Sequence, residues 1–245
     1  MTLYIIGLGL NDEKDITLKG LATIKKCRKV YLENYTSKLN CSVKKLEALY
    51  KKKIILADRD LVESQAEKTI LKEAKKNDVA FLVVGDPFGA TTHIDLVLRA
   101  KETKIKIKII HNASILTAIG IIGLELYKYG KVTSIPFHNE NVKTPVKVLK
   151  NNLANGLHTL FLLDLDPKQK KFLSINEAIE YLLKNNVHED IVAIGCAKLG
   201  SDNPTIKIGR LKELKNLKFD KFPQCLIIPA KLHFMEEEAL SLYKK

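Results

Sequence analysis

The run Gly85-Asp86-Pro87-Phe88-Gly89 contains the residue types that could bind a small ligand at the end of a strand. It ends the apolar strand predicted at 79–84 and precedes a hydroxyl-rich helix start at 91–93. The two glycines allow close approach of the backbone, and Pro87 stiffens the turn. Asp86 offers a carboxylate beyond the end of the strand, where open parallel sheets place their ligands. We interpret this run as a ligand loop.

Two further loops follow predicted strands. The run Gly7-Leu8-Gly9-Leu10 comes after the strand 3–6, and residues 111–115 come after the strand 106–110. Gly-x-Gly alone is a weak signal, and a simple turn explains it about as well as a ligand loop. Because the carboxyl ends of parallel strands meet at one edge of a sheet, we expect the three loops to lie together.

The first loop argues against a phosphate ligand. A dinucleotide fingerprint needs a third glycine at position 12, which is Asp12 here, and Glu13 and Asp15 follow it. A cluster of carboxylates repels phosphate, and the sequence has no Gly-Lys-Ser/Thr P-loop. Backbone contacts, one carboxylate and hydroxyls suit a cationic cofactor better. S-adenosylmethionine, with its sulfonium, ammonium and adenine, fits this description.

Other kinds of catalytic centre find no support in the sequence. His93 and His111 are interpreted as a helix-start polar residue and a strand-end residue, and a histidine such as His233, at the start of an apolar helix, is by itself more often a cap. We predict no metal site, because no His/Cys/Asp cluster has metal-ligand spacing. No Ser-His-Asp or Cys-His arrangement is evident. The four cysteines are scattered and are expected to be reduced structural thiols.

The elements that position these loops alternate between strand and helix over the first half of the chain. This alternation predicts an N-terminal α/β domain, residues 1–113, with a mostly parallel sheet. The predicted strands are 3–6, 29–35, 53–57, 79–84 and 106–110, and the predicted helices are 17–27, 43–50, 62–76 and 92–104.

The second half mixes its elements differently. Residues 114–127 are apolar nearly all round, which predicts a buried helix that opens a mixed α/β domain over 114–245. The neighbouring strands 191–195 and 205–209 predict an antiparallel hairpin. The other predicted elements are strands at 132–135, 158–163 and 225–229 and helices at 145–153, 175–185 and 232–243.

The formal charge of +13 raises the question of a nucleic-acid partner. The excess is nearly all lysine, spread over helix faces, without an Arg-rich block or interleaved aromatic residues. We therefore favour a solvated basic surface and expect no direct nucleic-acid contact, although attraction to a large macromolecular partner stays open. The longest apolar segment, 113–124, is too short to span a bilayer, and no signal peptide is evident, so a cytoplasmic protein is expected.

Eight motifs along the chain match one family in order. They are Leu-Tyr-Ile-Ile-Gly-Leu-Gly-Leu (3–10), Asp-Ile-Thr-Leu-Lys-Gly-Leu (15–21), Tyr-Thr-Ser (35–37), Gly-Asp-Pro-Phe-Gly-Ala-Thr-Thr-His (85–93), Ile-His-Asn-Ala-Ser-Ile (110–115), His-Thr-Leu-Phe-Leu-Leu-Asp (158–164), Asn-Pro-Thr-Ile (203–206) and Lys-Leu-His (231–233). Through these motifs the sequence resembles the diphthine synthase family of the tetrapyrrole-methylase-like superfamily, over nearly its whole length. The wider superfamily often has a more glycine-rich first loop, whereas Gly-Leu-Gly-Leu resembles the diphthine branch.

The resemblance implies two α/β domains of tetrapyrrole-methylase type, an interdomain cofactor cleft and a homodimer. It implies successive methylation, from S-adenosylmethionine, of the amino group of the aminocarboxypropyl-modified histidine of translation elongation factor 2, which gives diphthine. It also implies that several cofactor contacts are made by main-chain atoms. The cofactor-binding positions that it implies are Leu10, Asp86, Gly89, Ser114, Ile115, Leu165, Ala197 and His233.

Two other functions stay open from the sequence. One is a methyltransferase of the same fold that acts on a corrinoid precursor or ribosomal RNA. The other is a non-catalytic basic module that binds RNA or protein. We identify no catalytic base, and Asp86 is better interpreted as a cofactor anchor. The resemblance implies three methyl transfers for an archaeal-type enzyme and an additional esterification of the carboxylate for a eukaryotic type. The compact length resembles the archaeal type and residues 83–93 resemble the eukaryotic type equally; we favour three methyl transfers.

Overall fold

The computed structural model describes residues 1–89, 93–166 and 169–243. Residues 90–92 of the predicted ligand loop, including the predicted helix start at Thr92, lie outside the described residues, as does Lys168. The chain divides into two compact units, residues 1–116 and 117–245, and each is described by itself. The sequence placed the domain boundary after residue 113.

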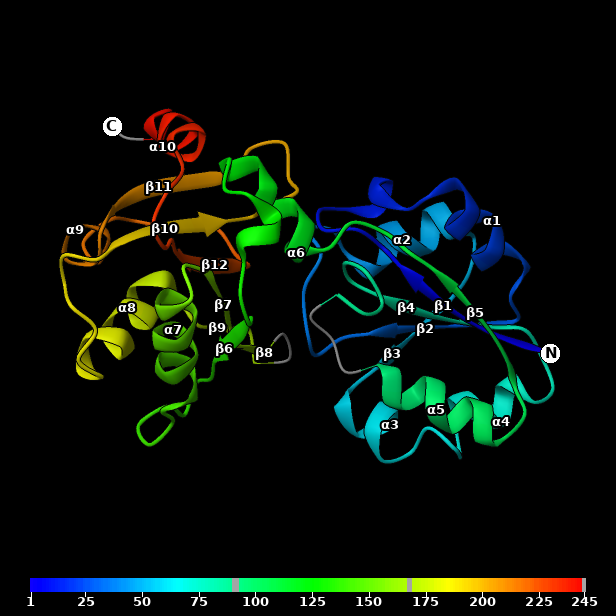
Figure 1. Cartoon of the computed structure of the whole chain (residues 1–245). Helices are drawn as coiled ribbons and strands as arrows, with labels where there is room; N and C mark the ends of the chain where they lie inside the picture. Colours follow the sequence, from blue (N-terminus) through cyan, green and yellow to red (C-terminus); the bar gives the residue numbers. More distant parts are fainter. Residues whose placement is uncertain (90–92, 167–168, 244–245) are drawn as a thin grey trace. The chain divides into compact units, whose positions relative to one another are not determined.

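The first unit contains a five-stranded parallel sheet with the strand order β3-β2-β4-β1-β5 (Figure 1). Every strand pair in it is parallel, which confirms the predicted parallel sheet. All carboxyl ends therefore lie at one edge. The strands are β1 (Thr2–Gly7), β2 (Lys29–Glu33), β3 (Ile54–Ala57), β4 (Val79–Val83) and β5 (Lys106–Ile110).

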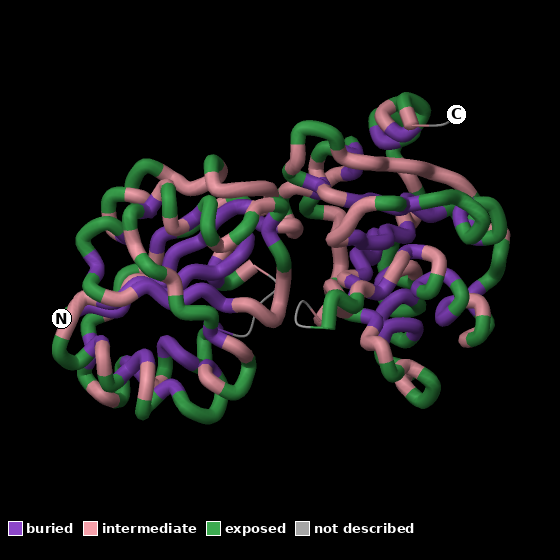
Figure 2. The backbone as a smooth tube through the Cα atoms, turned by 180° about the vertical axis from the view of Figure 1, so that it is seen from behind, coloured by how far each residue is buried: buried purple, intermediate pink, exposed green. Residues whose placement is uncertain are grey.

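Helices cover both faces of this sheet, because alternate strand residues point to opposite sides. On one face Ile5 and Phe81 pack with residues of α3 (Arg59–Glu63), α4 (Ile70–Ala74) and α5 (Ile94–Glu102). On the other face Ile6 and Leu82 pack with residues of α1 (Leu18–Lys26) and α2 (Val43–Tyr50). In Figure 2 the strands are the most continuously buried part of this unit.

The single helix predicted at 62–76 is wrong, because the structure has α3 and α4 separated by a turn. Arg99 of α5 explains the break. Its guanidinium donates to the carbonyls of Val62, at 2.6 Å, and Glu63, at 3.2 Å. A continuing helix would use these carbonyls as acceptors for residues four positions later.

The second unit contains a mixed five-stranded sheet with the order β11-β10-β12-β7-β6. The predicted hairpin is confirmed, because β10 (Val192–Ala197) and β11 (Thr205–Arg210) pair antiparallel. The other strands are β6 (Thr133–Ile135), β7 (Thr159–Leu163) and β12 (Gln224–Ile228), and β8 (Leu165–Asp166) and β9 (Lys171–Phe172) form a small separate ribbon.

One face of this sheet forms the core of the second unit. Phe161, Leu226 and Ile228 from the strands pack there with α7 (Thr144–Ala154), α8 (Ile175–Lys184) and α9 (Leu211–Leu214). The last helix, α10 (Phe234–Ser241), follows β12. None of the helices in the described part of the chain has the length and apolar character that crossing a bilayer requires.

The continuous buried helix predicted at 114–127 is also wrong. The structure has α6 (Ile115–Ala118), then η2 (Ile119–Ile122), and then, after a turn, η3 (Leu126–Lys128). Gly123 turns the chain with a φ of 89°, a conformation that side chains disfavour, and it packs against Ala239 of α10. The apolar pattern was misleading because not all of these side chains are buried: Ile121 is 57% and Tyr127 83% exposed.

Candidate functional site

The three predicted loops meet at the carboxyl edge of the first sheet. The backbone N–H of Gly85 donates to the Gly9 carbonyl at 2.8 Å, and the N–H of Gly9 donates to the Gly85 carbonyl at 3.3 Å. The N–H of Leu8 donates to the Val83 carbonyl at 2.9 Å. The first loop and the Gly85–Gly89 loop are therefore held against each other by their main chains.

Asn112, in the third loop, ties that loop to the first one. Its side-chain amide donates to the carbonyls of Gly7 and Asp15, both at 3.0 Å, and its carbonyl accepts from the N–H of Ala113 at 2.8 Å. The sequence analysis did not single out this residue. Its partners lie 105 and 97 positions away in the sequence, so no local sequence pattern predicts these hydrogen bonds.

Asp15 explains why the first loop does not offer a phosphate cradle. One oxygen of its carboxylate accepts from the N–H groups of Leu10, at 3.0 Å, and Asn11, at 2.7 Å. Phosphate-binding loops present such N–H groups to the ligand. Here the Asp15 carboxylate accepts from these N–H groups, so the loop carries a negative charge and would repel a phosphate.

Asp86 joins the second loop to the third. One of its oxygens accepts from the N–H of Phe88 at 2.9 Å, and the other lies 2.8 Å from Nδ1 of His111 and accepts from the N–H of Asn112 at 3.2 Å. Burial alone would raise the pKa of Asp86, but these hydrogen bonds lower it below its usual value. The carboxylate is therefore ionised at neutral pH, and His111 has a partner that its position in the sequence did not reveal.

Gly89 and Ser114 show why a glycine is needed in the second loop. A Cβ at position 89 would collide with the Ser114 hydroxyl. Ser114 is buried, and its hydroxyl accepts from the N–H of Leu116 at 3.2 Å. Ile115 follows as the first residue of α6. The structure thus gathers Leu10, Asp86, Gly89, Ser114 and Ile115 in one group of loops.

The three positions implied in the second unit are not gathered in this way. Leu165 and Ala197 lie at or just beyond the carboxyl ends of β7 and β10, which run in the same direction and so end at the same edge. β12 runs the opposite way, and its last residue, Ile228, pairs with Thr159 at the start of β7. His233 follows β12. His233 therefore lies toward the opposite edge of the sheet from Leu165 and Ala197. The length of β7, roughly 16 Å, separates the two edges.

His233 begins α10 within a buried polar network centred on Glu236. The carboxylate of Glu236 accepts from the N–H of His233 at 2.8 Å, from the N–H of Glu125 at 3.0 Å and from Lys128 Nζ at 2.5 Å. Burial would raise its pKa, but these donors and His158 Nε2 lower the pKa to about 2. This network connects the segment 119–128 to α10.

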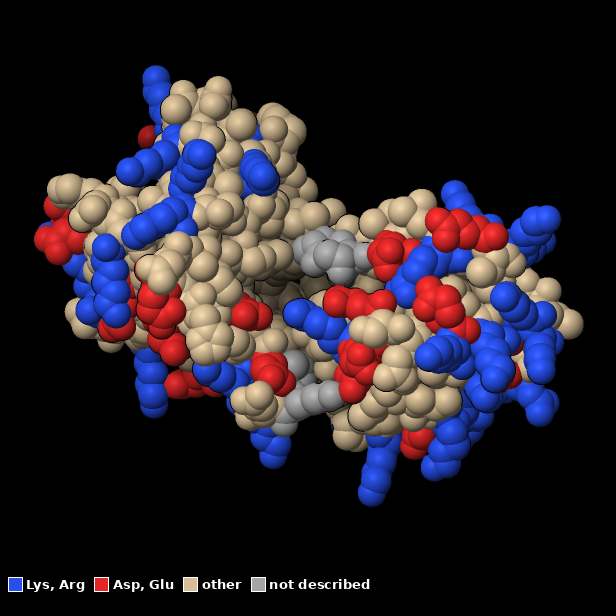
Figure 3. Space-filling view, turned by 90° about the horizontal axis from the view of Figure 1, so that it is seen from below, with Lys and Arg blue, Asp and Glu red and all other residues tan. Residues whose placement is uncertain are grey.

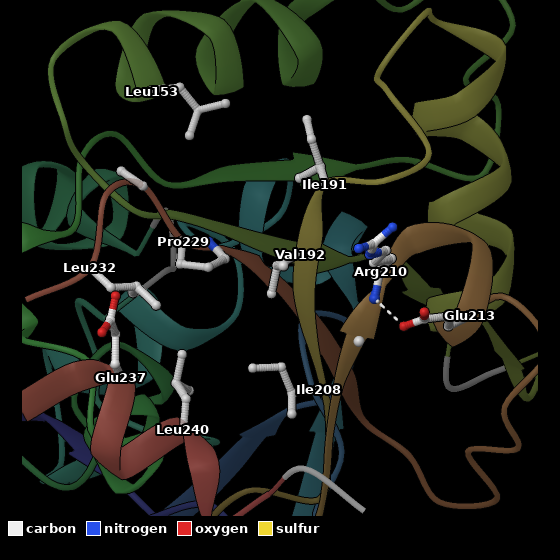
Figure 4. Close-up of a pocket in the computed structure, with 12 residues that line it drawn as sticks. Leu153, Ile191, Val192, Ile208, Arg210, Glu213, Pro229, Leu232, Glu237 and Leu240 are labelled. Atoms are coloured by element: carbon white, nitrogen blue, oxygen red, sulfur yellow. Dashed lines mark hydrogen bonds between the residues drawn. The ribbon is translucent and has the colours of Figure 1, made fainter. Parts of the chain in front are cut away.

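A pocket of about 770 Å³ lies next to α10 in the second unit (Figure 4). Its walls are mainly apolar, and the guanidinium of Arg210 lies to one side of it in the close-up. Its volume and apolar lining are typical of small-molecule pockets. The sequence analysis missed it because scattered apolar residues without a motif form it, most of them only partly buried: Leu153, Ile191, Val192, Ile208, Pro229, Leu232 and Leu240.

Within residues 1–89, 93–166 and 169–243, no group of three or more His, Cys, Asp or Glu residues is arranged to hold a metal ion. Burial raises the pKa of the Cys27 thiol to about 11, so this thiol is protonated at neutral pH. The loop edge of the first sheet offers carboxylates and carbonyls, which suit a cationic ligand.

Comparison with known proteins gives one consistent family. The family model described as Tetrapyrrole (Corrin/Porphyrin) Methylases matches residues 2–215. The chain is 46% identical to diphthine methyl ester synthase of Dictyostelium discoideum, covering 100% of this chain and 98% of the relative. It is 45% identical to diphthine synthase of Methanocaldococcus jannaschii, covering 97% of each. A crystal structure of diphthine synthase superposes with a TM-score of 0.94 at 38% identity, covering 100% of this chain and 96% of that one.

Proposed function

The chain belongs to the tetrapyrrole (corrin/porphyrin) methylase family, and we propose that it is an S-adenosylmethionine-dependent N-methyltransferase of diphthamide biosynthesis. Its substrate is the aminocarboxypropyl-modified histidine of translation elongation factor 2, and its product is diphthine. The observation that carries this proposal is the full-length identity to relatives named diphthine synthase and diphthine methyl ester synthase.

S-adenosylmethionine is proposed to bind through Leu10, Asp86, Gly89, Ser114, Ile115, Leu165, Ala197 and His233. The first five positions support this best, because they share one group of loops rich in acceptors for a cation. Leu10, Ile115, Leu165 and Ala197 have no polar side chain, so their polar contacts would be made by main-chain atoms. The other three positions rest on the resemblance alone.

Bound S-adenosylmethionine supplies an electrophilic methyl group on a sulfonium. The acceptor amine is mostly protonated at neutral pH and must lose a proton before each attack. The protein's part is to hold the donor and acceptor in line and to exclude water. The contacts from Asp86 and Asn112 serve this purpose by fixing the loop edge, and we assign no residue as a base.

Mass spectrometry tests the proposal directly. The protein is incubated with S-adenosylmethionine and elongation factor 2 that carries the aminocarboxypropyl group, and the modified peptide is then weighed. We expect three added methyl groups, all on nitrogen; a fourth that mild base removes would identify a methyl ester. An unmodified peptide would contradict the proposal. Parallel incubations with a corrinoid precursor and with ribosomal RNA are expected to add nothing.

We also propose that the protein acts in the cytoplasm as a homodimer. Five apolar side chains of the second unit that are at least 55% exposed support self-association: Ile121, Tyr127, Phe234, Met235 and Leu242. The two segments that carry them are in contact, since the Tyr243 hydroxyl donates to the Ile121 carbonyl at 2.9 Å. Exposed apolar patches on a folded protein often mark interfaces. Light scattering should give a dimer mass, and Tyr127→Lys with Leu242→Lys should give a monomer.

A further inference from the structure

The loop after β2 is a fourth loop at the carboxyl edge of the first sheet. Leu82 of β4 pairs with Leu32 of β2 on one side and with Ile6 of β1 on the other. The strands β1, β2 and β4 therefore end at the same level, and the loop after β2 leaves the sheet beside the strand that leads into Gly85–Gly89. We call residues 34–40 of this loop the crossing segment.

The crossing segment passes from one face of the sheet to the other. Tyr35 packs against the core on the face covered by α3, α4 and α5, whereas Leu39 is buried in the core on the face covered by α1 and α2. Both residues follow the end of β2, so residues 36–38 between them lie at the carboxyl edge itself. This is the edge at which we propose that the methyl donor binds.

The far end of the crossing segment is fixed to the first loop. The N–H of Asn40 donates to the Asn11 carbonyl at 2.6 Å, and the Asn40 side-chain amide donates to Asn11 Oδ1 at 2.8 Å. Asn11 directly follows Leu10, a proposed donor contact whose side chain lies against Gly85. The crossing segment therefore ends against the neighbour of a proposed donor contact.

Glu33, the last residue of β2, fixes the near end. It is 1% exposed, and one oxygen of its carboxylate accepts from the N–H groups of Tyr35, at 2.6 Å, and Thr36, at 2.5 Å. The other oxygen accepts from the Thr36 hydroxyl at 2.7 Å. All three donors belong to the crossing segment. Burying a carboxylate is costly unless it is hydrogen-bonded, so the turn that it fixes explains a glutamate at this place.

We propose that Glu33 is a positioning residue for methyl-donor binding: it holds the crossing segment at the carboxyl edge, where the segment forms a wall of the donor site next to Leu10. This inference rests on the proposed function and adds a residue that the implied contacts do not include. Glu33 acts through the segment and does not touch the donor. A wall that is ordered before the donor arrives lowers the entropy cost of binding.

Three variants test this role by calorimetry with S-adenosylmethionine. Glu33→Met removes the acceptors but keeps a side chain of similar size, and we expect the Kd to rise about tenfold. Glu33→Gln keeps an oxygen for the two N–H groups, and its amide nitrogen can donate to the Thr36 hydroxyl, so the Kd should stay within about twofold of wild type. Asn40→Ala, at an exposed position, removes the side-chain bond to Asn11 and should raise the Kd about fivefold.

Steady-state methylation of elongation factor 2 that carries the aminocarboxypropyl group gives a second measurement. At saturating S-adenosylmethionine we expect kcat of Glu33→Met to stay within about twofold of wild type, while KM for the donor rises about tenfold. A defect of this kind belongs to donor binding, and its absence in Glu33→Gln separates the hydrogen bonds of Glu33 from general packing.

Glu47→Met is the matched control. Glu47 also accepts a main-chain N–H, that of Ile54 at 3.0 Å, but Ile54 begins β3 and so lies at the amino edge of the same sheet. We expect its Kd for the donor to stay within about twofold of wild type, even though its stability falls. Urea denaturation of all the variants compares their stabilities.

A wild-type Kd in both Asn40→Ala and folded Glu33→Met would overturn the positioning role while leaving the proposed function in place. An equal rise of the Kd in Glu33→Met and Glu47→Met would overturn it too. If Glu33→Met does not fold, Asn40→Ala decides alone. A wild-type protein that binds no methyl donor and transfers no methyl group would overturn the proposed function, and this inference with it.

Discussion

Single side chains fix the shape of the loop edge in the first unit. The Asn112 amide, the Asp15 carboxylate and the Asp86 carboxylate each bind main-chain groups of a neighbouring loop or of their own loop. Two of these residues, Asn112 and Asp15, are not among the contacts that the resemblance implies, whereas Asp86 belongs to both sets.

Asn112→Asp tests this role of the amide. The substitution keeps the shape of the side chain but places an acceptor opposite the carbonyls of Gly7 and Asp15. We expect the free energy of unfolding to fall by about 1–3 kcal/mol and the affinity for S-adenosylmethionine to fall by about tenfold or more. Urea denaturation and calorimetry measure the two effects. Asn216→Asp, at an exposed amide that contacts the Lys212 carbonyl, is the control and should change neither.

His93 predicts a pH dependence of stability. Its pKa is about 4 in the folded protein and near 6.5 when unfolded, so the unfolded chain binds more protons between these values. Stability is therefore fully present above pH 6.5 and falls as the pH drops toward 4, by up to about 3 kcal/mol. Urea denaturation at several pH values should show this slope, and His93→Phe should reduce it. An identical slope in the variant would contradict the prediction.

At the scale of helices and strands, features set by local sequence were predicted correctly, whereas features set by contacts between residues far apart in the sequence were not. The parallel sheet was predictable because strand and helix alternate regularly along the chain. The helices at 62–76 and 114–127 were not, because their breaks depend on Arg99 and on the packing of Gly123 against Ala239. The loops of the candidate site were predictable because each directly follows a predicted strand. The pairing of Asp86 with His111 was not, because these residues lie in different loops.

Helix α8 offers a local test of stability. Ser174 and Glu177 form a reciprocal capping box, in which the Ser174 hydroxyl accepts from the N–H of Glu177 and the Glu177 carboxylate accepts from the N–H of Ser174. Ser174→Ala should lower the free energy of unfolding by about 1 kcal/mol. Ser174→Thr, which keeps the hydroxyl, should lose much less. Thermal or urea denaturation distinguishes the two variants, and equal losses would argue against the cap.

At the scale of the whole molecule, charge is the property most relevant to a protein substrate. The chain has a formal charge of +13. On the face seen in Figure 3, lysine and arginine side chains are interspersed with acidic ones and do not form a single basic patch. Such a distribution favours general attraction to an acidic partner over recognition of a specific charged surface.

Turnover on elongation factor 2 should therefore depend on salt. Raising the ionic strength shortens the distance over which opposite charges attract, from about 10 Å at 0.1 M to about 3 Å at 1 M. We expect kcat/KM to fall several-fold between low and moderate salt while kcat changes little. Steady-state kinetics at several sodium chloride concentrations measures this, with S-adenosylmethionine affinity as the control. A kcat/KM independent of salt would exclude a role for the net charge.

The position of β1 in its sheet has a consequence for how the protein is made. β1 is translated before both of its neighbours in the sheet, β4 and β5, with which it pairs through residues 79–83 and 106–110. Contacts so distant along the chain form late and expose apolar strand edges in the meantime. β1 therefore has neither sheet partner until residues 79–83 have been translated and lacks its second partner until residues 106–110 follow, so we expect chaperones that act on nascent chains to bind this apolar stretch.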